Sequence, residues 1–87
     1  MSETYEAGQR WIRSQFHEIA KELSVPLGDS EWKQLRQDGD YIMLSLVYEI
    51  SGIRHVEKFS GDEIDDSARD PAIQVRLKNR IRKLLVY

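Results

Sequence analysis

Residues 40–64 read DYIMLSLVYEISGIRHVEKFSGDEI, and the way this stretch folds decides the fold class of the chain. Its first half fits two patterns equally well. In a strand, the residues on one face would be Ile42, Leu44, Leu46, Tyr48 and Ile50. In a helix, the apolar residues on one side would be Ile42, Met43, Leu46, Val47 and Ile50. Periodicity alone leaves both alternatives open.

The residues that follow favour the strand. Ser60 and Glu63 have the spacing of a capping box, and Phe59 and Ile64 occupy the two positions of a hydrophobic staple, so a helix is predicted to begin at Ser60. Between Gly52 and that helix only residues 53–59 remain, a length that suits a strand better than a helix. A two-residue turn at 51–52 predicts a hairpin with strands at about 41–50 and 53–59.

Helices are predicted on both sides of this hairpin. Residues 2–23 are predicted to form a helix that Ser2 caps. Its apolar stripe contains Tyr5, Ile12, Phe16, Ile19 and Leu23. Pro26 and Gly28 end this helix. A short second helix is predicted to begin at Asp29 or Ser30, to place Trp32 and Leu35 one turn apart, and to end at the Asp38-Gly39-Asp40 cluster.

Asp70-Pro71 opens the last predicted helix, since Asp caps well and Pro suits the first helical position. Its apolar stripe contains Ile73, Leu77, Ile81, Leu84 and Leu85. We therefore predict one α+β domain over residues 1–87, in the order α-α-β-β-α-α, with a two-stranded hairpin packed on helices. An all-α helical bundle is the alternative.

Composition excludes several classes of function. The net charge of -2 gives no overall attraction to nucleic-acid phosphates or anionic lipids. The chain has no cysteine, which excludes disulfides and thiolate catalysis, and we expect a cytoplasmic protein. No apolar run approaches the roughly 20 residues of a membrane-spanning helix, so no membrane association is expected. The sequence contains no stretch specific enough to name a family.

Catalytic and DNA-binding motifs are weak. His17 and His55 are the only histidines, neither stands in a metal-binding pattern, and Ser60 is already explained as a cap. We therefore expect no catalytic site, metal or cofactor. Residues 19–35, IAKELSVPLGDSEWKQL, superficially match a helix-turn-helix, but the connection SVPLGD is longer than the usual turn of roughly three or four residues.

Two surface features remain as candidate binding sites. Trp11 lies beside the apolar stripe of the first helix, where it either extends the core under the hairpin or anchors an interface. The last helix contains no acidic residue and five basic ones, Arg76, Lys78, Arg80, Arg82 and Lys83. Acidic residues at 62–66 could fold back over these cations and compensate them.

The preferred hypothesis is a small non-catalytic interaction or regulatory module that binds a protein partner or itself, with a homodimer expected. Its candidate contacts are Trp11, Arg76, Arg80 and Lys83. The alternative is a nucleic-acid-binding protein with candidate contacts at Arg54, Lys58, Arg76, Lys78 and Arg82.

Overall fold

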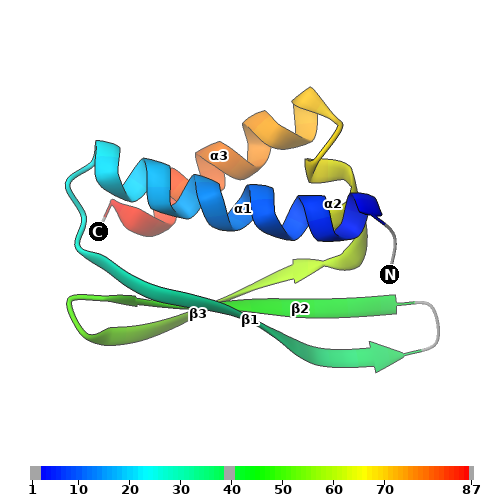
Figure 1. Cartoon of the computed structure of the whole chain (residues 1–87), viewed down its shortest axis with the longest axis horizontal. Helices are drawn as coiled ribbons and strands as arrows, with labels where there is room; N and C mark the ends of the chain where they lie inside the picture. The colour runs from blue at the N-terminus through cyan, green and yellow to red at the C-terminus, as the bar shows by residue number, and fades with distance from the viewer. Residues whose placement is uncertain (1–2, 39–40, 87) are drawn as a thin grey trace.

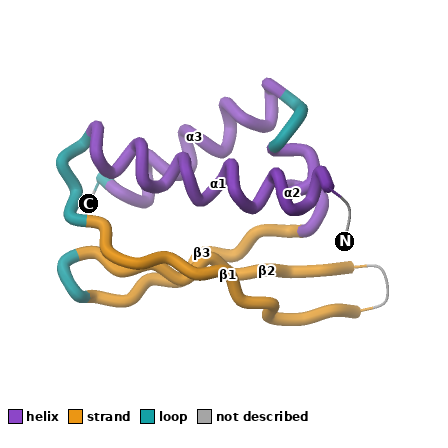
Figure 2. Tube along the Cα trace, in the orientation of Figure 1, coloured by secondary structure: helices purple, strands orange, loops and turns teal. Residues whose placement is uncertain are grey.

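The computed structural model describes residues 3–38 and 41–86. The elements follow in the order α1 (Glu3–Glu22), β1 (Leu27–Asp38), β2 (Tyr41–Ile50), β3 (Ile53–Ser60), α2 (Gly61–Ser67) and α3 (Pro71–Leu85). The strands form one antiparallel sheet, β1-β2-β3, and these helices lie on one face of it (Figure 1). The tube view shows the two layers, one of helices and one of strands (Figure 2). The predicted α+β class is confirmed, and the all-helical alternative is wrong.

The predicted hairpin is confirmed as β2 and β3. Ile50 lies opposite Ile53, which leaves Ser51 and Gly52 as the two turn residues. Both have positive φ, 53° at Ser51 and 80° at Gly52. This combination is typical of a type I′ turn, whose twist matches that of the strands it joins.

The second predicted helix is wrong, because those residues belong to β1. β1 pairs with β2 along its length, so the sheet is a three-stranded meander and not a two-stranded hairpin. The register shifts between Leu27 and Ser30 and again between Gln34 and Arg36. Such irregularities interrupt the alternation of inward and outward side chains by which a strand is recognised in sequence. Ser2 and residues 39–40, predicted as a cap and as part of a helix end, lie outside the described residues.

Both predicted caps of the C-terminal half are confirmed. Ser60 Oγ accepts a hydrogen bond from the Glu63 backbone N–H at 3.2 Å, and Ser60 Oγ donates to the Glu63 carboxylate at 3.2 Å. At the start of α3, Asp70 accepts from the Ala72 N–H at 3.0 Å, and Pro71 occupies the first helical turn. These bonds satisfy N–H groups that have no partner inside the helix.

The core lies between the helices and the sheet. β2 contributes Leu44, Leu46 and Tyr48, all buried, from the centre of the sheet. The ring of Phe16 on α1 packs on Tyr48, with ring centroids 5.0 Å apart, and meets the Phe59 ring edge-on at 6.4 Å. From α3 the core receives Leu77, Ile81 and Leu85, which belong to the predicted stripe.

Gly8 allows α1 and α2 to cross at very short distance. A Cβ atom at this position would lie 1.7 Å from the carbonyl oxygen of Ile64 and 2.9 Å from Ser67 Oγ. Ser67 Oγ itself donates to that carbonyl at 2.7 Å, and both Ile64 and Ser67 are fully buried. The backbone of α1 therefore rests directly on that of α2.

Gly8→Ala tests this crossing. Alanine is favoured over glycine in a helix by about 1 kcal/mol, but here the added methyl group collides with buried backbone. We expect a net loss of more than about 2 kcal/mol in the free energy of unfolding, measured by urea denaturation. A neutral or stabilised variant would contradict the crossing.

Ser60→Ala tests the capping box that separates β3 from α2. Loss of this cap is expected to lower the free energy of unfolding by about 0.5–2 kcal/mol. The matched change Ser14→Ala, at an exposed serine on α1, is expected to stay within about 0.5 kcal/mol of the unmodified protein. Equal losses in the two variants would argue against a specific role for Ser60.

Candidate functional site

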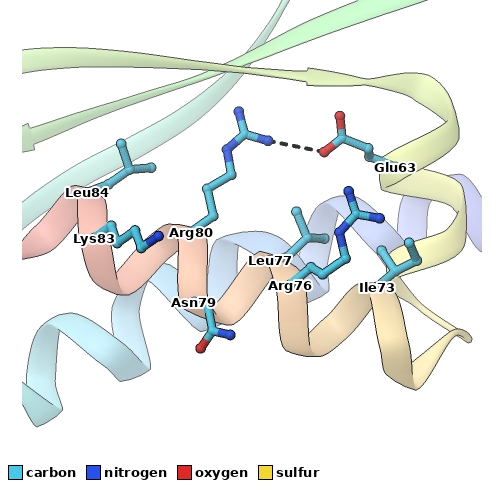
Figure 3. A pocket seen from close by; sticks show the side chains of 8 residues that line it. All are labelled: Glu63, Ile73, Arg76, Leu77, Asn79, Arg80, Lys83 and Leu84. Atoms are coloured by element: carbon cyan, nitrogen blue, oxygen red, sulfur yellow. Dashed lines mark hydrogen bonds and ion pairs between the residues drawn. The ribbon is translucent and has the colours of Figure 1, made fainter.

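An open groove of about 470 Å³ runs along the surface of α3. Its lining combines apolar and charged side chains, Ile73, Arg76, Leu77, Asn79, Arg80, Lys83 and Leu84 of α3 together with Glu63 of α2 (Figure 3). The groove exists because α3 packs mainly against α1 and α2 rather than against the sheet. One side of α3 therefore remains accessible.

Arg80 connects α3 to the edge strand β3. Its guanidinium carbon lies 4.5 Å above the centre of the Phe59 ring, a cation–π contact. It donates to the Glu63 carboxylate at 3.1 Å and to the backbone carbonyl of Lys58 at 2.7 Å, and it also pairs with the Glu57 carboxylate. Arg80 is thus committed to partners within the protein.

Arg76 and Lys83 differ from Arg80 in this respect. Both are exposed, and they lie about one helical turn to either side of Arg80 along the groove. Within the described residues, neither side chain has an ion-pair partner. Beside them the groove contains apolar surface from Ile73 and Leu84, which are partly exposed. Cations beside apolar surface can bind a ligand that carries carboxylates next to apolar groups.

The other predicted basic contacts lie elsewhere. Arg82 pairs with the Glu22 carboxylate at 3.2 Å, and Lys78 is exposed on α3 but does not line the groove. Arg54 and Lys58 are exposed on β3. The candidate nucleic-acid contacts therefore divide between α3 and the sheet.

The acidic residues 62–66 compensate the basic helix only in part. Glu63 reaches Arg80, but Asp65 and Asp66 pair with Arg69, each at 3.4 Å, at the end of α2. Trp11 is half-buried and packs against the core. Of the residues predicted to contact a partner, the groove brings together Arg76, Arg80 and Lys83.

Sequence reasoning missed a polar cluster between α1 and β1. Arg13 Nε donates to Ser30 Oγ at 2.9 Å, and His17 Nε2 lies 3.0 Å from the same hydroxyl. Ser30 is only 5% exposed and its hydroxyl is already engaged by both side chains, so the cluster is best explained as a tie between helix and sheet. Because residues 29–38 were predicted as a helix, nothing in the sequence placed Ser30 opposite α1.

Comparisons with known proteins give no further indication of function. No protein-family model matches the chain, and no curated protein or solved structure gives a match. Among the described residues, no helix is both long enough and apolar enough to cross a membrane.

A comparison of Arg80→Gln with Arg76→Gln tests whether Arg80 is held by partners within the protein while Arg76 is not. Arg80→Gln removes a cation–π contact and ion pairs with Glu57 and Glu63, and we expect it to lower the free energy of unfolding by about 1–2 kcal/mol. Arg76→Gln is expected to change it by less than about 0.5 kcal/mol. Chemical denaturation measures both, and a loss at Arg76 equal to that at Arg80 would contradict the assignment.

Proposed function

We propose that this chain is a non-catalytic interaction module that binds an acidic, partly apolar segment of a partner protein in the α3 groove. The observation that supports it is the contrast among the cations of α3. Arg80 and Arg82 are paired within the protein, whereas Arg76 and Lys83 stay exposed beside apolar surface. Charges that the fold leaves uncompensated on an otherwise acidic chain are available to a ligand.

The length of the groove suits a short helical segment. From Ile73 to Leu84 the lining extends over twelve residues of helix, or about 16 Å, which is close to three turns. An amphipathic helix of that length can place apolar side chains on Ile73 and Leu84 and acidic ones beside Arg76 and Lys83. Two copies of this chain are poor mutual ligands here, because their groove cations would face each other.

Binding of nucleic acid through α3 is the second candidate. The exposed Arg76, Lys78 and Lys83 support it. The net charge of -2 and the intramolecular pairing of Arg80 and Arg82 argue against it, since any phosphate contact works against the rest of the surface. A regulatory role and a cytoplasmic location remain predictions from the sequence.

Selection of peptides from a random phage-displayed library tests the proposed partner chemistry. We expect enriched peptides to combine Asp or Glu with apolar residues at helical spacing. Arg76→Gln/Lys83→Gln is expected to weaken their binding by at least about tenfold, since two cations are lost from the groove. The matched control Lys21→Gln/Lys78→Gln removes the same charge outside the groove and should bind normally. Enrichment of peptides without acids, or equal binding by both double variants, would overturn the proposal.

A salt titration with mixed oligonucleotides tests the second candidate. We expect no binding near physiological salt. Submicromolar binding that weakens steeply with salt would instead favour nucleic acid. In that case Arg76→Gln/Lys83→Gln should make the salt slope shallower by roughly two, about one unit for each lost phosphate contact.

A further inference from the structure

The face of the sheet opposite the helices carries an ordered arrangement of charges. Along β2, Leu44, Leu46 and Tyr48 are buried toward the helices, so the alternating residues Ser45 and Val47 belong to the opposite face. Figure 1 shows the described helices on one side of the sheet only. On the other side Val47 is partly exposed and Val56 is 50% exposed. This outer face therefore has an apolar centre that the described part of the chain leaves open to solvent.

Strand register places the outer-face side chains in rows that cross the sheet. One row contains Lys33, Ser45 and Lys58, and the neighbouring row contains Glu31, Val47 and Val56. A basic row thus lies beside a row whose only charge is acidic. Next to them is a hollow of about 270 Å³, lined by the acids Asp29, Glu31 and Glu49 together with Lys33, Val47 and Arg54.

Ser45, at the centre of the basic row, is a buried polar residue. Its side chain is 1% exposed, and its hydroxyl has no hydrogen-bond partner among the described residues. A hydroxyl this deeply buried is not accessible to a ligand, so Ser45 adds no binding contact on this face. The basic row therefore offers an acidic ligand the two exposed ammonium groups of Lys33 and Lys58.

We infer that this outer face is a self-association surface, on which a second copy of the chain binds face to face. The two copies are related by a two-fold axis that lies between the two sheets, parallel to them, and runs perpendicular to the strands. An axis between the two rows places Glu31 of each copy over Lys33 of the other. The Glu31 carboxylate can then accept from the ammonium of Lys33. By the same symmetry, each Lys33 faces the acid-lined hollow of the other copy, and Val47 and Val56 become covered.

The second copy is the favoured occupant because the charges on this face complement themselves. A two-fold axis places the basic row of each copy over the Glu31 row of the other. A uniformly acidic or uniformly basic partner would instead meet one row of its own charge. The face is small, about 400 Å² per copy from the spacing of strands and residues. An interface of that size is weak and transient, so dimers should form only at high micromolar concentration. This inference is independent of the α3 groove, which lies on the other side of the sheet.

A charge swap tests the inference, with sedimentation velocity over a concentration series as the measurement. The unmodified protein is expected to dimerise at high micromolar concentration and low salt, and less so at high salt. Glu31→Lys and Lys33→Glu, measured separately, should each weaken dimerisation by at least about tenfold, because like charges then oppose each other across the axis. When the two variants are mixed, unlike charges face each other again, and heterodimers should form.

Two controls separate binding from folding. Lys78→Glu makes the same charge change as Lys33→Glu on α3 and should dimerise normally. Dilute Glu31→Lys and Lys33→Glu should melt within a few degrees of the unmodified monomer, because both side chains are exposed. A protein that stays monomeric at high micromolar concentration, a dimer unaffected by both charge reversals, or a mixture that forms no heterodimer would each overturn the inference.

Discussion

Burial of the helix-facing side chains of β2 is the constraint on which the rest of the structure depends. Leu44, Leu46 and Tyr48 lie on the central strand, so they are covered only when strands flank β2 on both sides and helices cover one face. Phe16 from α1 and Phe59 from β3 complete this layer through their ring contacts. A chain of 87 residues buries a modest share of its surface, which makes a single well-packed layer decisive for its stability.

Arg80 links this core to the surface. Its guanidinium covers the Phe59 ring and binds the Lys58 carbonyl on the edge strand, where an unpaired backbone group would otherwise invite pairing with another chain. The acids Glu57 and Glu63 compensate its charge. One arginine of the basic helix thus protects the sheet edge, and the cations on either side of it remain available for binding.

The two proposed surfaces have different charge patterns. The α3 groove has Arg76 and Lys83 as uncompensated cations, which suits an acidic segment from another protein and disfavours self-binding. The outer face of the sheet alternates basic and acidic rows, which suits a second copy of the same chain. Because the helix layer and the outer face lie on opposite sides of the molecule, both could be occupied together.

The sequence by itself determined the features that depend on neighbouring residues. The Ser60 cap, the Ser51-Gly52 turn, the Asp70-Pro71 start and the stripe of α3 need only a few adjacent side chains, and all are present in the structure. The sequence also showed that this helix carries cations and no acid, but not which of the cations the fold would pair.

Tertiary structure alone decided β1, the role of Arg80 and the crossing at Gly8. The spacing of Trp32 and Leu35 suggested a helix, but the edge of β2 offers hydrogen bonds that a short helix there could not replace, and the register shifts hide the strand pattern. Arg80 meets Phe59, and Gly8 meets Ile64, across long stretches of chain. Contacts of this kind depend on which elements become neighbours in space, and local sequence patterns carry no information about that.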